Sequence, residues 1–285
     1  MSTLFAPLDQ ANAQAGGPTS VPMTGSTSLL EGFEFTRDSL MRGRVTLYQP
    51  RQGFRSSVDP VLLAGFLTPP YGRLLDIGCG TGALAFQLCA QDPAATGVGV
   101  ELQPRLGQLL ALGVAHNGLA DRFRIEVGDI RTVQLPAASF DLVATNPPFQ
   151  ALGQGVLPAD RERAIAHHEV ELRLEEWIAR AASLCRPGGR VGVVFPASRS
   201  TELLARLEAE GLIPQRLRPV YPRAGQPATR VLVEARRLPQ ARLRPLVFEP
   251  PLHVYVGEVY SDEVRGFFGD DAAPTKANPG DEAGT

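Results

Sequence analysis

The sequence predicts a doubly wound α/β domain with a mostly parallel β-sheet. Short apolar segments of strand length alternate between residues 73 and 236 with longer segments of helical length, and short turns join them. Glycine or polar residues come directly after several of the expected strands at their carboxyl ends, which is the edge where such sheets bind ligands. These two observations favour one large α/β domain with a ligand site at that edge.

Apolar runs, and the turns that end them, mark the individual elements. Residues 73–77 form an apolar run before a glycine-rich turn, and a helix over residues 103–117 ends at the capping pair Asn117-Gly118. A helix over residues 171–185 is stopped by the turn at Pro187-Gly188. Further strands are expected at residues 95–100, 123–127, 140–145, 190–195, 216–221 and 230–236, and further helices at 83–90 and 200–210. No helix separates the last two strands, so we expect them to form an antiparallel hairpin at one edge of the sheet.

The segment before the first strand is expected to cap the ligand-binding edge. Residues 44–50 have the pattern of a strand, and residues 59–67 form a short helix with Pro60 in its first turn. Both chain ends are rich in small, polar or acidic residues and contain too few apolar ones to order themselves. The expected organisation is a disordered tail over residues 1–30, a cap over 31–68, the main domain over 69–260 and an acidic disordered tail over 261–285.

Several function classes are disfavoured by composition. No apolar stretch approaches the roughly 18 residues of a transmembrane helix, and the N-terminus lacks the pattern of a secretory signal. Cys79, Cys89 and Cys185 have no metal-ligand spacing, and their odd number argues against a disulfide framework. The adjacent His167 and His168 point in different directions on a helix, so a loop or helix cap is preferred there. We expect a cytoplasmic protein without a membrane segment or a metal site.

Charge is distributed unevenly along the chain, although the net charge is only −2. Residues 206–244 contain nine Arg and three Glu, a local charge of +6, whereas residues 258–285 contain seven acids, one Arg and one Lys, a local charge of −5. Lys276 is the only lysine, so abundant arginine reflects a general bias and is weak evidence for nucleic acid. Arg223 and Arg230 flank a Gly- and Pro-containing loop, where they either contact phosphates or are solvated.

A glycine-rich turn comes after the first strand, in the segment Asp76-Ile77-Gly78-Cys79-Gly80-Thr81-Gly82. Glycines let the backbone turn sharply and approach a ligand without a Cβ clash. Glu101 comes after the second strand, roughly 20 residues further on, where an acid commonly binds ribose hydroxyls. The turn therefore predicts an adenosine-containing cofactor. It does not choose between NAD and a methyl donor, because the dehydrogenase glycine pattern is also satisfied.

Asp129 comes after Gly128 at the end of the third strand. Its carboxylate can accept a hydrogen bond from an adenine amino group, or it can form an Asx turn with the next backbone groups. The position at the carboxyl end of a strand favours the first role.

The segment Asn146-Pro147-Pro148-Phe149 comes after the fourth strand and points to chemistry on an amine. An exocyclic or amide nitrogen is a poor nucleophile, because its lone pair is delocalised. The Asn146 side-chain oxygen and the Pro147 carbonyl can each accept one N–H, which orients the lone pair and stabilises developing positive charge. Pro148 stiffens the loop, and Phe149 can stack on a planar substrate, worth about 1–3 kcal/mol for a base.

Taken together, these motifs resemble class I S-adenosylmethionine-dependent methyltransferases that act on amino groups. More narrowly, the chain resembles the bacterial family of tRNA1(Val) adenine-37 N6-methyltransferases, since residues 44–63 and 222–235 are similar to that family's N-terminal segment and C-terminal hairpin. The resemblance covers residues 33–260. It implies a Rossmann-like, seven-stranded sheet with an antiparallel last strand, S-adenosylmethionine as cofactor, and a monomer that methylates N6 of adenine in RNA, expected to be a tRNA.

The motifs and the resemblance together assign expected roles to individual residues. The expected cofactor-binding residues are Asp59, Asp76, Gly78, Cys79, Gly80, Glu101, Leu102, Asp129, Ile130 and Asn146. The expected catalytic residues are Asn146, Pro147 and Phe149. The expected substrate contacts are Pro148, Arg223 and Arg230.

Three alternative functions stay open at this point. The same amide-orienting chemistry suits protein-glutamine N5-methylation. Phe149, where this family often has Tyr, is also familiar in guanine-N2 rRNA methyltransferases. A non-catalytic RNA-binding protein on the same scaffold is the third. A nicotinamide dehydrogenase is disfavoured because the chain has no Tyr-x-x-x-Lys pair.

Overall fold

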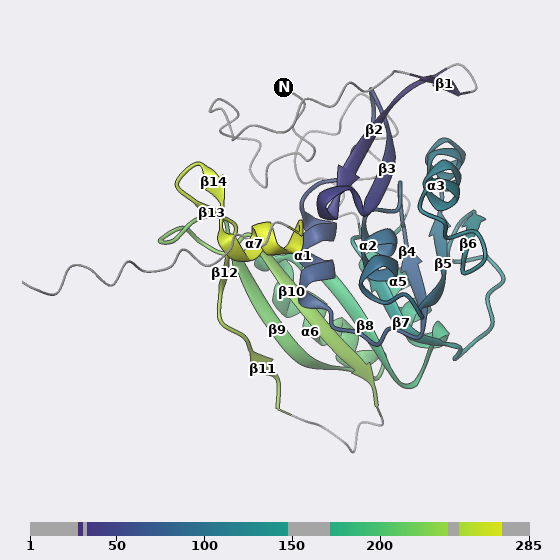
Figure 1. The fold of residues 1–285 in the computed structure, drawn as a ribbon. Helices are drawn as coiled ribbons and strands as arrows, with labels where there is room; N and C mark the ends of the chain where they lie inside the picture. Colours follow the sequence, from purple (N-terminus) through teal and green to yellow (C-terminus); the bar gives the residue numbers. More distant parts are fainter. Residues whose placement is uncertain (1–27, 31–32, 148–171, 239–244, 270–285) are drawn as a thin grey trace, which may run out of the picture.

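The structure, a computed structural model, describes residues 28–30, 33–147, 172–238 and 245–269. At its centre is a nine-stranded sheet in the order β11-β9-β10-β8-β7-β4-β5-β6, with β12 also paired to β9 (Figure 1). Its strands are β4 (Arg73–Ile77), β5 (Thr96–Glu101), β6 (Phe123–Val127), β7 (Phe140–Thr145), β8 (Cys185–Pro196), β9 (Leu212–Tyr221), β10 (Arg230–Arg237), β11 (Val247–Phe248) and β12 (Leu252–His253). Strands β6, β5, β4, β7 and β8 are parallel, whereas β10 is antiparallel to both β8 and β9. The predicted doubly wound α/β fold is confirmed.

Helices cover both faces of this sheet. They are α1 (Asp59–Phe66), α2 (Ala83–Gln91), α3 (Pro104–His116), α5 (Leu174–Leu184), α6 (Ser200–Ala209) and α7 (Asp262–Phe267). Successive side chains of a strand point to opposite faces, so Leu74 packs in the core formed with α1, α2, α3 and α7. Leu75 and Ile77 pack in the second core, with α5 and α6. Asp76 therefore lies on the α1–α2 face of the sheet.

The sheet has more strands than the predicted seven. The additional strands β11 and β12 contain two residues each and pair parallel with the outer side of β9. The predicted hairpin forms from β9 and β10, but β10 lies inside it, between β8 and β9. The expected turn after α5 is also part of a strand, because Cys185 already pairs with Phe140 and begins β8.

The acidic tail begins later than the expected residue 261. Ser261 caps α7 by accepting a hydrogen bond from the Val264 backbone N–H at 3.3 Å, and Val264 is fully buried. A Cβ added to Gly65 of α1 would lie 2.4 Å from the Phe267 ring, so the two helices are in close contact. Before α7, the strands β13 (Tyr255–Val256) and β14 (Val259–Tyr260) form a small hairpin with stacked tyrosines.

The N-terminal cap is a small antiparallel sheet joined to α1. It contains β1 (Ser28–Leu30), β2 (Phe33–Leu40), the short 3-10 turn η1 (Met41–Gly43) and β3 (Val45–Pro50). Asn117, at the end of α3, donates to the Thr46 carbonyl and accepts from the Thr46 N–H, both at 2.8 Å, which fastens the cap to the main domain. The cap lies beside α2 and α3 (Figure 1). The predicted strand and the Asp59 helix are confirmed, while β1 and β2 were not predicted.

Membrane-spanning helices and metal-ligand clusters are both missing from the residues that the structure describes. No helix in these ranges combines the length and apolar character needed to cross a membrane. Nor do the described side chains include a group of three or more His, Cys, Asp or Glu residues placed to hold a metal ion.

Candidate active site at the carboxyl edge of the sheet

The carboxyl ends of neighbouring strands line up along one edge of the sheet. Ile77 of β4 pairs with Val100 of β5 on one side and with Thr145 of β7 on the other. Pro196 at the end of β8 pairs with Arg230 at the start of β10, so the same edge continues across the hairpin. Neighbouring strands are about 4.8 Å apart. Along this edge the predicted site residues therefore lie in the order Arg230, Asn146, Gly78, Glu101 and Asp129.

The glycine-rich turn adopts a backbone conformation that only glycine accepts readily. Gly78, Gly80 and Gly82 have φ angles of +69°, +55° and +92°. The Gly78 and Cys79 N–H groups both donate to the Val100 carbonyl, at 2.9 and 3.0 Å, which ties the turn to β5. A Cβ at Gly82 would lie 2.6 Å from Phe86, whereas one at Gly78 would meet nothing within 4 Å. Gly82 is thus required by packing, and Gly78 leaves open space where a ligand can approach.

Glu101 and Asp76 accept hydrogen bonds from the backbone of this turn and of the helix that follows it. Glu101 is buried, and its carboxylate accepts from the Gly80 N–H at 2.8 Å and from the Gln103 N–H at 2.9 Å. Asp76 is also buried and accepts from the Ala85 N–H at 3.2 Å. Burial raises the pKa of Asp76 well above its usual value, and the charge of Glu101 raises it further. Two acids beneath a glycine turn favour a ligand that carries N–H, hydroxyl or cationic groups.

Three other predicted cofactor residues lie in less open positions. Cys79 is buried, and burial raises the pKa of its thiol well above the usual value, so a reactive thiolate is disfavoured. Ile130 packs in the core beside α5, and Leu102 is half-buried next to Glu101. These side chains are apolar or buried, so a polar contact between these residues and a cofactor would come from their backbone groups.

Asn146 presents a buried acceptor that no group of the described chain satisfies. Its Oδ1 atom is fully buried and has no hydrogen-bond partner. The residue before it, Thr145, donates from its side chain to the Ile77 carbonyl at 2.9 Å, which fixes the end of β7 against β4. Pro147 is buried. Pro148 and Phe149 lie outside the described residues, as do His167 and His168.

Asp59 and Arg230 form an ion pair that the sequence analysis did not anticipate. The Arg230 Nε donates to Asp59 Oδ2 at 3.2 Å, and the two residues are 171 positions apart in the chain. The Asp59 side chain is 2% exposed, and its other oxygen, Oδ1, has no hydrogen-bond partner. No local pattern signals such a contact, because it depends on α1 lying over the start of β10.

Asp129 is engaged by Arg131 in the structure. The Arg131 Nε donates to Oδ1 at 3.0 Å and to Oδ2 at 2.9 Å, and Nη2 donates to Oδ2 at 2.5 Å. The backbone N–H of Arg131 donates to Oδ1. The Arg131 hydrogen bonds hold the pKa of Asp129 below its usual value. The Asx turn is thus present, and an adenine amino group would share the carboxylate with Arg131.

Four arginines of residues 206–244 pair with acids from other elements, namely Arg216, Arg218, Arg223 and Arg230. Arg216 pairs with Glu249 at 2.5 Å, and Arg218 pairs with Glu263 at 2.6 Å. Arg223 lies 5.2 Å from the Tyr255 ring centre, and its Nη2 is 3.8 Å from Glu258. The excess positive charge along the chain therefore does not become a basic surface at these positions.

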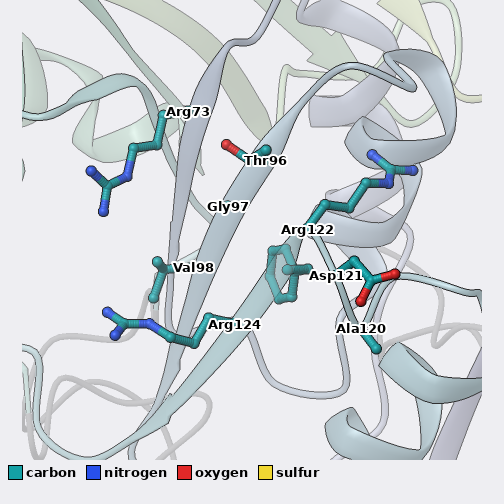
Figure 2. A pocket seen from close by; sticks show the side chains of 9 residues that line it. Arg73, Thr96, Gly97, Val98, Ala120, Asp121, Arg122 and Arg124 are labelled. Atoms are coloured by element: carbon teal, nitrogen blue, oxygen red, sulfur yellow. The ribbon is translucent and has the colours of Figure 1, made fainter.

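A hollow of about 350 Å³ lies at the opposite edge of the sheet (Figure 2). Arg73, Thr96 and Phe123 line it, and these are the first residues of β4, β5 and β6. The Arg122 side chain is bound to backbone carbonyls at 2.9 to 3.4 Å, and Arg124 pairs with Glu126 at 3.1 Å. Because ligands of parallel sheets bind at the carboxyl edge, this hollow is not the candidate active site.

Comparisons with known proteins identify the kind of domain that carries this edge. A model of the methyltransferase domain matches residues 74–168, from β4 past Asn146. A crystal structure described as a predicted O-methyltransferase from Agrobacterium tumefaciens superimposes with a TM-score of 0.59 at 22% identity, covering 75% of this chain and 97% of that chain. The fold and the matched domain place the chain among the class I methyltransferases, whose methyl donor is S-adenosylmethionine.

Sequence relatives identify the family. The tRNA1(Val) (adenine(37)-N6)-methyltransferase of Porphyromonas gingivalis is 32% identical over 202 residues, covering 68% of this chain and 78% of that protein. The protein of the same name from Tolumonas auensis is 33% identical over 194 residues, covering 67% of this chain and 80% of that protein. The chain belongs to the tRNA1(Val) (adenine(37)-N6)-methyltransferase family.

The residues at the edge fit S-adenosylmethionine. Open space lies over Gly78, where a Cβ would meet no atom within 4 Å. Two buried acceptors, Asp59 Oδ1 and Asn146 Oδ1, lack partners within the described chain. A buried acceptor without a partner costs about 1–3 kcal/mol, so both positions favour a ligand that brings N–H groups.

Proposed function

We propose that this methyltransferase modifies the exocyclic N6 amine of an adenine in RNA, and that its target is adenine-37 of a tRNA. The observation that carries the proposal is the buried, unpartnered Oδ1 of Asn146 at the end of β7. An amine with two N–H groups satisfies such an acceptor. The names of the relatives support adenine N6 as that amine.

The proposed chemistry depends on holding a weak nucleophile in one orientation. S-adenosylmethionine supplies a methyl group that is activated on a positively charged sulfur. Asn146 Oδ1 and the Pro147 carbonyl each accept one N–H of the target amine, which directs the nitrogen lone pair out of its conjugation with the ring. Both acceptors also stabilise positive charge on that nitrogen. The methylated nitrogen is acidic and releases its extra proton afterwards, so this step uses no strong base, no covalent enzyme intermediate and no metal.

Residues along the edge are proposed to divide the cofactor between them. Glu101 accepts from the ribose hydroxyls while it keeps its hydrogen bond to the Gly80 N–H. Asp76 and the open backbone at Gly78 face the methionine end. Asp129 accepts from the adenine amino group. Its partner Arg131 keeps the carboxylate ionised at neutral pH, as the lowered pKa of Asp129 indicates.

The proposed contacts to the RNA substrate come from residues of the loops. Pro148 and Phe149 are proposed to shape the target pocket and to stack on the base. Arg223 is proposed to contact an RNA phosphate, which would compete with Glu258 across their 3.8 Å separation. We further propose that the protein acts as a cytoplasmic monomer. Light scattering during size-exclusion chromatography tests the monomer directly.

Tritium transfer from labelled S-adenosylmethionine tests the reaction. The acceptor is total RNA from a strain that lacks this gene, and the wild-type protein is compared with Asn146→Ala. Gln134→Ala is the matched control, because Gln134 is exposed and its amide bonds only to the nearby Thr132 carbonyl. We expect label as N6-methyladenosine in the tRNA fraction with the wild type and the control, and loss of at least about 100-fold with Asn146→Ala.

Other outcomes of the same experiment contradict the proposal in identifiable ways. Label in protein but not in RNA would indicate glutamine methylation. Label as N2-methylguanosine in ribosomal RNA would indicate the guanine reaction. Equal activity of Asn146→Ala and the wild type would show that Asn146 does not orient the acceptor.

A further inference from the structure

The ion pair between Asp59 and Arg230 is built into the active-site edge. Asp59 is the first residue of α1, and Arg230 is the first residue of β10. The Arg230 side chain is 19% exposed, donates from Nη1 to the Thr229 carbonyl at 3.1 Å, and donates from Nε to Asp59 Oδ2 at 3.2 Å. Its guanidinium is thus directed inward, toward α1. A residue expected to contact RNA phosphate is placed to hold a buried carboxylate.

Asp59 is held on the side of the site that borders the glycine turn. Phe54, five positions before it, packs beside Gly80, and its ring would lie 3.1 Å from a Cβ there. The chain between them is held in place, because the Ser56 N–H donates to the Gln49 side chain at 2.8 Å. The Asp59 N–H donates to the Ser57 hydroxyl at 3.2 Å. Asp59 therefore follows a segment that packs on the glycine turn, and it contacts the start of β10 itself.

The Asp59 carboxylate has one oxygen in use and one available. Arg230 occupies Oδ2, while Oδ1 is buried and has no partner among the described residues. The hydrogen bond from Arg230 and the burial of the side chain restrict rotation of the carboxylate, so Oδ1 keeps one direction before any ligand arrives. A buried carboxylate oxygen favours a cationic N–H donor over a neutral one, because a charge-assisted hydrogen bond is about twice as strong.

We propose that Asp59 Oδ1 binds the α-ammonium group of the methionyl end of S-adenosylmethionine, and that Arg230 is the positioning residue for this carboxylate. The inference rests on the proposed arrangement of the cofactor along the edge. Arg230 acts through Asp59 and touches neither the reacting methyl group nor the RNA. Its guanidinium compensates the charge of Asp59 and fixes its direction, and its removal leaves a buried carboxylate with no cationic partner.

Binding of two ligands by the full-length protein tests this inference. S-adenosylhomocysteine carries the α-ammonium group, whereas methylthioadenosine has the same nucleoside and sulfur but lacks the amino-acid end. Calorimetry would compare the wild type, Asp59→Asn, Arg230→Met, Arg230→Lys and the Asp59→Asn/Arg230→Met double variant. Arg236→Met is the matched control, since Arg236 lies in the same strand, is exposed, and donates to the Gly188 carbonyl at 3.4 Å.

We expect Asp59→Asn and Arg230→Met each to weaken S-adenosylhomocysteine about 10- to 100-fold and to leave methylthioadenosine within about twofold. The double variant should lose little more than either single variant, because Arg230 acts through Asp59. Arg230→Lys should recover part of the loss by restoring a positive charge, and Arg236→Met should bind both ligands like the wild type.

Two results would overturn the inference. One is equal weakening of both ligands by Asp59→Asn and by the charge-conserving Arg230→Lys, which would indicate a general structural defect. The other is normal S-adenosylhomocysteine binding by Arg230→Met together with weakened tRNA binding, which would assign Arg230 to phosphate. Failure of the wild type to bind either ligand would instead contradict the proposed function itself, so the two failures are distinguishable.

Discussion

Substitution of Gly78 by alanine separates the ligand-binding role of the glycine turn from its structural role. Gly78 has a φ of +69°, and a Cβ there would meet no atom within 4 Å. The substitution therefore carries only the cost of placing alanine in the left-handed region, about 1–2 kcal/mol of unfolding free energy. The new methyl group would occupy the space above the turn. If the cofactor lies there, its affinity should fall more than about tenfold, which corresponds to about 1.4 kcal/mol.

Gly118 is the matched control for backbone strain. It has a φ of +64°, a Cβ there would also meet nothing within 4 Å, and it lies beyond the end of α3. Gly118→Ala should lose about the same 1–2 kcal/mol and bind S-adenosylmethionine like the wild type. Gly82→Ala provides the opposite case, because its Cβ would lie 2.6 Å from Phe86 and 2.8 Å from Leu110. Overpacking should add about 1–3 kcal/mol to its loss of stability.

The assay combines urea unfolding, which measures the free energy of unfolding, with calorimetric titration of S-adenosylmethionine. The expected pattern is equal destabilisation of Gly78→Ala and Gly118→Ala, with weakened binding only in Gly78→Ala. Unchanged binding in Gly78→Ala would show that the open space over the turn is not cofactor space. Weakened binding in Gly118→Ala would show that backbone strain, rather than occupied space, reduces the affinity.

Three further predictions concern stability. Asp76→Asn should have a larger free energy of unfolding than the wild type near neutral pH, and this difference should grow as pH rises from about 4. The reason is that burial raises the pKa of folded Asp76, so that its ionisation opposes folding. A difference in unfolding free energy that does not change with pH would contradict this. Asn117→Ala should lose about 1–3 kcal/mol in urea unfolding, because both 2.8 Å hydrogen bonds to Thr46 disappear; an unchanged value would mean that they do not fasten the cap. Val264→Ala should lower the free energy of unfolding by about 1.5–3 kcal/mol, because Val264 is fully buried. Val256→Ala should change it little, because Val256 is 65% exposed. Equally small losses in both variants would place α7 outside the folded domain.

Local patterns were sufficient for elements with a dense apolar run and a strong terminator. The bounds of β4, β6 and β7 agree with the predicted residues 73–77, 123–127 and 140–145. Strands β11 to β14 contain two residues each, too few for a period-two pattern to be visible. Helix α7 falls within the expected acidic tail, because its segment DEVRGF is short and half of its residues are charged, so composition hides the helix.

The sequence by itself determined the class of fold, the order of the elements and the positions of the glycine turn, Glu101, Asp129 and Asn146. These depend on local periodicity and on the residue types directly after each strand, and both signals lie within short stretches of the chain. Only the tertiary structure decided that Arg230 faces Asp59, that Asp129 is held by Arg131, and that Arg216 and Arg218 pair with acids from other elements. A salt bridge is decided by distance in space, and distant segments meet only after the sheet and its helices have packed.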